Sequence, residues 1–234
     1  MHREEGCMES NREYAEVLMR QEQYDRPILA FKLCDEAPSW AEPYGNDQSF
    51  GCAITAEACE KEKPMYITME NIMCGGGVYA GIGMPHIEKE AFNAAMSMVI
   101  GEGRAFATRQ VMRRATQQIP HHFKRHKYLV IGRLEQMAET DIVMIIACVE
   151  KVMRLCRAYT WETGELVHGI QGTTWCGQSL AYAYRKKMPT FSFGCGSSRP
   201  LMNLGPGELF FTVHSDLLPI IVKNIEHVSI GAME

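Results

Sequence analysis

The sequence predicts an α/β fold in which a single mixed sheet is flanked by helices, with a mixed α+β arrangement as the alternative. Three observations support this prediction. The chain has 234 residues with 46% hydrophobic and 22% charged side chains, which is enough apolar material for a substantial core. Strand-like runs alternate with helix-like segments over the C-terminal half. Residues 141–148 are almost continuously apolar, which is typical of a strand covered on both faces.

The first part of the chain alternates helix-like and strand-like segments. Apolar residues at helical spacing predict an amphipathic opening helix over residues 11–23, which Arg26-Pro27 ends. Ser49 is a typical N-cap for the next helix, over residues 51–61. The predicted strands of this part are residues 28–33 and 65–68. The sequence shows no internal repeat and no linker segment. We therefore expect one α/β domain over residues 1–234 with an N-terminal helix.

The middle of the chain is rich in glycine. A loop runs from Cys74 to Pro85, and its low side-chain variety excludes regular structure. Helices are expected over residues 87–98 and 103–117, and the second carries several arginines. A polar loop with three histidines follows at residues 120–126, and it is most simply a solvated loop.

The C-terminal half continues the alternation. Its predicted strands are residues 127–134, 141–148, 190–193 and 209–213. Its predicted helices are residues 149–159, 178–186 and 215–225, and Ser215 is the expected N-cap of the last one. A loop is expected at residues 195–198.

Charge and hydropathy exclude some classes of function. The net charge of −4 argues against a dedicated nucleic-acid binder, which usually carries a basic excess. The longest apolar run, residues 142–149, is far shorter than the roughly 20 residues that cross a bilayer. The N-terminal residues are polar and acidic, so we expect no secretory signal and a cytoplasmic location.

Cysteine usage points to possible chemistry. The chain has nine cysteines, and four of them lie next to glycine near the end of a predicted element. Glycine lets the backbone approach an inorganic centre and leaves amide N–H groups available to a thiolate. Four thiolates suit an iron–sulfur cluster or a tetrahedral zinc site, although no Cys-x2-Cys pair is present, and small residues packed in tight turns are the alternative. The four candidate metal ligands are Cys52, Cys74, Cys176 and Cys195.

The order of several short motifs adds to this. They are Phe50-Gly51-Cys52-Ala53, Ile72-Met73-Cys74-Gly75-Gly76, Thr163-Gly164-Glu165, Cys176, Cys195-Gly196-Ser197-Ser198-Arg199 and Glu208-Leu209-Phe210. This order resembles the domain-of-unknown-function family 169, from about Tyr14 to the C-terminal segment. The resemblance implies positions for a site and no reaction, since the family has no settled activity.

The resemblance singles out the same four cysteines as the glycine context. In the family a Cys-x3-Arg turn follows a late strand, which here resembles Cys195 to Arg199. A cysteine followed by small residues precedes a tyrosine, as in Cys74 to Tyr79. The family often has an acidic residue before that arginine, where this chain has Ser198, so a role that needs a carboxylate there is in doubt.

Two hypotheses from different classes follow. The first is a cysteine-rich protein that binds an iron–sulfur cluster, or zinc as the alternative metal, and exchanges electrons with a redox partner protein. The second is a metal-free thiol enzyme or binding protein that holds a small anion or nucleotide with a glycine-rich loop and an arginine, while Cys74 or Cys195 acts as the nucleophile. A third interpretation, without catalysis or metal binding, is a homo-oligomeric scaffold whose cysteines are structural. The residues expected to hold the anion are Gly75, Gly76, Gly77 and Arg199.

Overall fold

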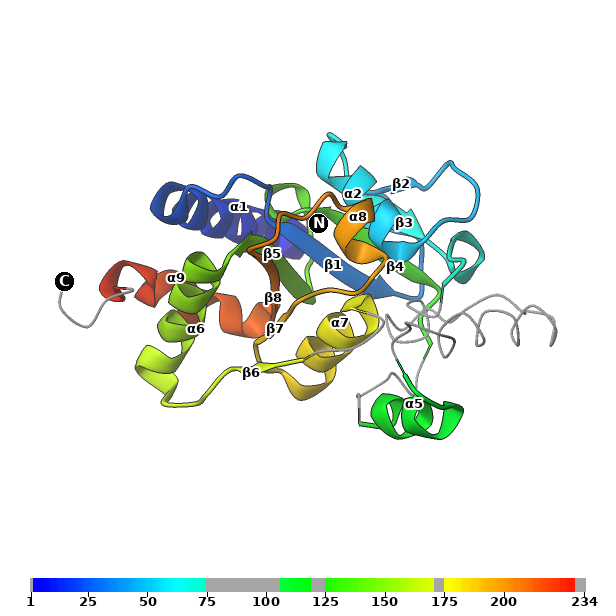
Figure 1. The fold of residues 1–234 in the computed structure, drawn as a ribbon. Helices are drawn as coiled ribbons and strands as arrows, with labels where there is room; N and C mark the ends of the chain where they lie inside the picture. The colour runs from blue at the N-terminus through cyan, green and yellow to red at the C-terminus, as the bar shows by residue number, and fades with distance from the viewer. Residues whose placement is uncertain (1, 75–105, 119–124, 171–174, 230–234) are drawn as a thin grey trace.

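The structure is a computed structural model that describes residues 2–74, 106–118, 125–170 and 175–229 (Figure 1). Its strands form one mixed sheet of eight strands in the order β2-β3-β4-β1-β5-β8-β7-β6. Helices pack on the sheet, so the predicted α/β fold with a single mixed sheet is confirmed. The strands are β1 (Leu29–Cys34), β2 (Glu42–Pro43), β3 (Met65–Ile67), β4 (Tyr128–Arg133), β5 (Ile142–Cys148), β6 (His168–Gly169), β7 (Thr190–Ser192) and β8 (Glu208–His214).

The described helices precede, separate and follow these strands. The α-helices are α1 (His2–Glu22), α2 (Gly51–Glu60), α5 (Arg109–Thr116), α6 (Val149–Thr163), α7 (Trp175–Lys186), α8 (Ser198–Leu201) and α9 (Leu218–Asn224). Short 3-10 turns are η1 (Met69–Asn71), η2 (Leu134–Gln136), η3 (Ser215–Leu217) and η4 (Ile225–His227). No helix in the described part of the chain is long and apolar enough to span a membrane.

The centre of the sheet is antiparallel. β1 pairs antiparallel with both β4 and β5, and β5 pairs with β8 along its whole length, from Ile142 opposite His214 to Cys148 opposite Glu208. The two parallel pairs, β2 with β3 and β6 with β7, lie at the two edges. Each edge strand has only two residues, which limits the backbone groups available for further pairing.

The two faces of the sheet bury separate cores, and alternation along β5 shows why. Val143, Ile145 and Ala147 pack with α1, α6 and α9 on one face. Ile142, Met144 and Ile146 pack with α2, α7 and the end of α8 on the other. The continuous apolar run of this strand is therefore explained by burial on both sides. We call the second layer, which carries α2, α7 and α8, the thiol face (Figure 1).

Several element boundaries differ from the prediction. The opening helix begins at His2 and not near residue 11. Ser49 does not cap α2, because the N-cap is Phe50 without a side-chain hydrogen bond, and Ser49 instead forms a β-bridge with Ile72. Thr108 caps α5, so that helix begins later than expected. The expected helix over residues 87–98 lies outside the described residues.

The C-terminal part also differs in detail. The expected loop at residues 195–198 leads directly into α8, a single helical turn. The predicted terminal helix is divided into η3, α9 and η4, and the cap of η3 is His214, not Ser215. Pro219 fits at the start of α9, where a proline costs no hydrogen bond. The single domain over residues 1–234 stays a prediction.

Candidate functional site

Cys52 lies at the start of α2 on the thiol face. It is the second residue of the helix and is almost fully buried. Burial raises the pKa of its thiol to about 11, and the nearby thiols of Cys195 and Cys74 raise it further, while the amide groups of Cys52 and Ala53 act in the opposite direction. Cys52 is therefore a neutral thiol at pH 7 in the absence of a metal. It lies close enough to Cys74 and Cys195 for their charge to affect its titration.

Cys74 is held beside the start of α2 by the backbone. The Met73 N–H donates to the Ser49 carbonyl oxygen at 3.0 Å, and Ser49 pairs with Ile72 in a parallel bridge. Ile72 is buried and lies against Gly51. The segment that leads to Cys74 is thus fixed to the segment that leads to Cys52, which explains why two cysteines 22 positions apart are neighbours.

Cys195 lies in a turn that a buried serine closes. The Cys195 N–H donates to Ser198 Oγ at 2.7 Å, and the Ser198 N–H points at Cys195 Sγ at 3.4 Å. Gly194, just before the cysteine, has φ of +81°, a conformation that glycine adopts without strain. The turn opens α8, and α8 packs on α2, so Cys195 is brought toward Cys52.

Arg199 holds the same loop together. Its Nη1 donates to the carbonyl oxygens of Phe193 and Glu208 at 2.9 and 3.2 Å, and its Nη2 donates to the carbonyl oxygen of Gly205. The Arg199 guanidinium thus donates hydrogen bonds to three backbone carbonyl oxygens. Its binding to an anion stays a prediction. The other three predicted anion ligands, Gly75, Gly76 and Gly77, lie outside the described residues.

Three of the four predicted ligands therefore share one face of the sheet. The fourth, Cys176, is the second residue of α7 on that same face, and its side chain lies outside the described part of the structure. Among the described residues, no three His, Cys, Asp or Glu side chains come close enough together to hold a single metal ion. The seven cysteines whose side chains are described are free thiols.

Two other cysteines provide a contrast. Cys156 lies on α6 against the opposite core, where burial raises the pKa of its thiol to about 12. Cys59 lies at the far end of α2 and donates to the Thr55 carbonyl oxygen at 3.5 Å. Burial raises the pKa of the Cys59 thiol, Arg26 and Arg133 lower it, and Glu60 raises it. Cys59 packs against the same core as Cys52, one helix length away along α2.

Comparison with known proteins agrees with the motif order. The sequence pattern of the domain-of-unknown-function family 169, described as "Uncharacterised ArCR", matches residues 17–224. The chain belongs to this family. An uncharacterised protein of Methanocaldococcus jannaschii is similar, with 25% identity over 226 residues that cover 92% of this chain and 94% of that protein. No solved structure matches the chain.

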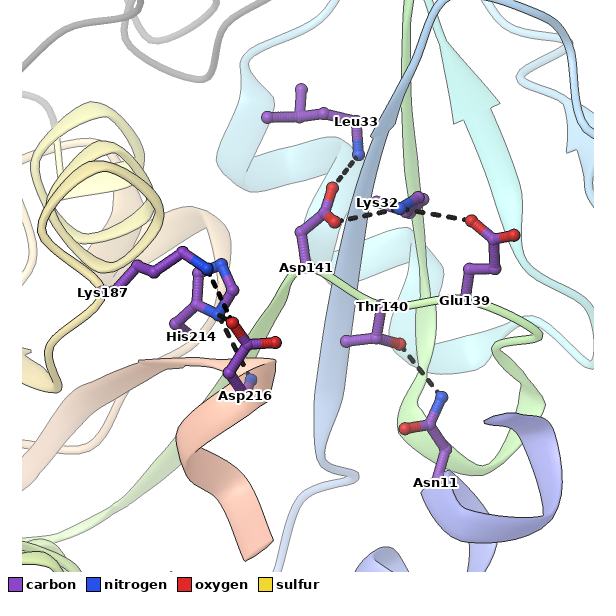
Figure 2. Close-up of polar contacts among 9 residues, drawn as sticks. All are labelled: Asn11, Lys32, Leu33, Glu139, Thr140, Asp141, Lys187, His214 and Asp216. Atoms are coloured by element: carbon purple, nitrogen blue, oxygen red, sulfur yellow. Dashed lines mark hydrogen bonds and ion pairs between the residues drawn. The ribbon is translucent and has the colours of Figure 1, made fainter. Parts of the chain in front are cut away.

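This family 169 protein also has a polar network that sequence reasoning missed (Figure 2). Asp141, just before β5, accepts hydrogen bonds from Lys32 Nζ at 3.0 Å and from the Leu33 N–H at 2.8 Å. Glu139 lies 3.2 Å from the same ammonium group. Burial lowers the pKa of Lys32, but the two carboxylates outweigh it, so the net shift is upward. This half-buried ammonium ion ties β1 to the turn before β5.

A second part of the network lies at the end of β8. His214 Nδ1 accepts from the Asp216 N–H at 3.2 Å, which places the proton of the neutral ring on Nε2. The Asp216 carboxylate binds Lys187 Nζ at 2.7 Å (Figure 2). Burial lowers the pKa of His214, so the imidazole is neutral at pH 7. The sequence signal for this network is Asp141, a charged residue directly before the apolar run of residues 142–149.

The structure describes the predicted histidine-rich loop at residues 120–126 only in part. His121 and His122 lie outside the described residues. His126 is half-buried, and its Nδ1 lies 3.3 Å from Asp35 Oδ1. Its ring lies 6.5 Å from the ring of Tyr184 on α7. His126 is therefore part of the packing between α7 and the start of β4, and not of a solvated loop.

Proposed function

We propose that this family 169 protein holds an iron–sulfur cluster through Cys52, Cys74, Cys176 and Cys195 and serves in electron transfer or related redox work. The observation that carries the proposal is that Cys52, Cys74 and Cys195 pack in one core on the thiol face, although they come from the start of α2, the segment after η1 and the turn before α8. The thiols of Cys74 and Cys195 also act on Cys52. Free thiols are expected for such ligands, and the described cysteines are free.

We prefer a cluster to a single zinc ion because the ligands would be all sulfur and drawn from segments spread over the fold. A tetrahedral zinc site requires four sulfur atoms at about 2.3 Å from one ion. No such group of side chains exists among the described residues. A cluster distributes its cysteine ligands over several iron atoms, so its thiols lie farther apart while still sharing one site.

The protein supplies three features for such a site. The start of α2 directs the amide groups of Cys52 and Ala53 at a sulfur atom, which stabilises the thiolate form. The Ser198 N–H donates to Cys195 Sγ at 3.4 Å and so orients this sulfur atom. Apolar neighbours, such as Ile54 and Phe210, restrict water on the inner side. A bound cluster would supply one-electron chemistry, and a redox partner protein would take or give the electron. The proposed compartment is the cytoplasm, where reducing conditions keep cysteines as thiols.

The metal-free alternative has less support. It needs Arg199 to hold an anion, and the described contacts of Arg199 are to three backbone carbonyls. We therefore prefer the metal centre.

Metal content tests the proposal directly. The protein and single cysteine-to-alanine variants are purified without oxygen, and iron, zinc and acid-labile sulfide are measured per chain. Cys52→Ala, Cys74→Ala and Cys195→Ala should each lose most of the iron and sulfide. The matched control is Cys156→Ala, a half-buried cysteine on the opposite face, which should keep both. Full iron content in the first three variants, or zinc without iron in the wild type, would contradict the proposal.

A further inference from the structure

A cavity of about 590 Å³ lies between α1 and the C-terminal end of α2. Its walls are α1, the segment from Tyr24 to Ile28, the end of α2 and the turn η2 after β4. The volume lies in the range of small-molecule sites, about 300–1,000 Å³. Cys52, Cys74 and Cys195 do not line it, so the cavity is distinct from the thiol site.

Part of the lining is apolar. Ala15 and Ile28 are buried in the core behind the cavity, and Met19 is partly exposed beside them. Tyr24 also lines the cavity and is 6% exposed. Its hydroxyl group is buried without a hydrogen-bond partner in the described part of the chain. A buried phenol without a partner is costly unless water or a ligand bonds to it.

Two guanidinium groups line the cavity with unused donors. Arg133 donates from Nε to the Cys59 carbonyl oxygen at 2.9 Å, and its two terminal nitrogens bond to no residue that the structure describes. Arg12, exposed on α1, makes no hydrogen bond or ion pair within the described ranges. Arg26 differs, because the Glu208 carboxylate binds it at 2.9 and 3.0 Å.

Carboxylates line the same cavity and are also unpaired. Glu16, Asp25, Glu60 and Glu135 form no ion pair with any described residue, although arginines line the same cavity. A ligand with negative charge alone would meet four carboxylates, and a ligand with positive charge alone would meet two unpaired guanidinium groups. A ligand with both charges satisfies both sets.

We propose that this cavity binds a small zwitterion, an amino acid or short peptide with an apolar side chain. Its carboxylate lies toward Arg12 and Arg133, since a guanidinium matches a carboxylate with two parallel hydrogen bonds. Its ammonium group lies toward the carboxylates of the rim, and its side chain lies on Ala15, Met19 and Ile28. This binding function is independent of the cluster proposed above.

Calorimetric titration with the dipeptide alanyl-leucine tests the inference on the full-length protein. We expect saturable binding with a Kd at or below roughly 1 mM. Arg133→Gln and Arg12→Gln should each weaken binding about tenfold, because each removes a charge-assisted contact. Arg114→Gln, an exposed arginine on α5 that does not line the cavity, is the matched control and should bind as the wild type does.

The outcomes that overturn the inference are defined by the same titration. One is equal affinity for the acetylated and amidated dipeptide, which carries no charge. Another is unchanged affinity in both arginine variants, and a third is no binding of alanyl-leucine to the wild type at about 10 mM. Arg12 is an exposed residue that makes no hydrogen bond or ion pair to a described residue, so its variant should keep the fold, and circular dichroism checks this.

Discussion

Gly194→Ala tests the geometry that presents Cys195. Gly194 has φ of +81°, and a Cβ atom built on it would lie 2.7 Å from Ser198 Oγ and 2.8 Å from Phe210 Cε2. Phe210 is fully buried in the core of the thiol face, so its ring is surrounded by other core side chains. Ser198 Oγ is the acceptor for the Cys195 N–H, so its displacement breaks the turn.

The expected loss of stability follows from two terms. An alanine in the left-handed region costs about 1–2 kcal/mol. Overpacking against a rigid core side chain costs about 1–3 kcal/mol. We therefore expect the free energy of unfolding to fall by about 2–5 kcal/mol, measured by urea denaturation as a shift of the midpoint at constant slope. Because the turn holds Cys195, the same variant should also lose iron.

Variants of two other glycines separate the cost of the backbone conformation from the cost of overpacking. Gly196→Ala lies in the same turn with nothing within 4 Å of the new Cβ and should change stability by less than about 0.5 kcal/mol. Gly164→Ala has φ of +68° but open space, so it should lose only the conformational part, about 1–2 kcal/mol. If Gly194→Ala is no less stable than Gly164→Ala, the packing part of the reasoning is refuted.

Three further predictions concern titratable groups. In the metal-free protein, alkylation of Cys52 followed by mass spectrometry should still accelerate up to about pH 11, because burial and the neighbouring thiols raise the pKa of its thiol to about 11; a plateau by pH 9 would contradict this. Asp141→Asn should lower the free energy of unfolding by about 1–3 kcal/mol in urea, because Lys32 loses its closest carboxylate while the Leu33 N–H keeps an acceptor; a loss below about 0.5 kcal/mol would disprove the role of the ion pair. Burial lowers the pKa of His214, so the unfolded chain binds more protons near pH 6 and wild-type stability should fall as the pH drops from about 7.5 to about 5. His214→Gln should flatten this dependence in thermal unfolding, and an identical slope in both proteins would show that His214 does not cause it.

The fold class was predictable because its main signals are local. The apolar run of β5 predicts a strand with both faces covered, and the structure buries alternate residues in two cores. The two-residue strands β2 and β6 were missed, because two residues contain no periodicity. α8 was missed for the same reason, since it is a single turn. The opening helix extends back to His2 through a polar stretch that has no apolar pattern.

The candidate site was predictable only in part. The glycine context identified Cys52, Cys74 and Cys195, and the structure packs all three against one core, with Cys74 and Cys195 close enough to Cys52 to raise the pKa of its thiol. What the sequence does not contain is the pairing of Ser49 with Ile72 that makes two of them neighbours. The polar network was missed because Lys32 and Asp141 are far apart in the chain and meet only when β1 pairs with β5.

The cavity at α1 was also beyond sequence reasoning. Its lining comes from four segments spread over more than 120 positions, from Arg12 to Glu135. From the sequence alone, each charged residue of the cavity is expected to be an ordinary solvated side chain. Only the fold shows that they surround one space and that all of them except Arg26 form no ion pair with a described residue.

X-ray absorption at the iron edge, on protein purified without oxygen, tests the central claim most directly. The account predicts iron surrounded by sulfur with a second iron atom as a near neighbour, which is the signature of a cluster on cysteine ligands. The same signal should remain in Cys156→Ala and be lost in Cys52→Ala. Iron bound by nitrogen and oxygen atoms, or a sample with sulfur-bound zinc and no iron, would contradict the account.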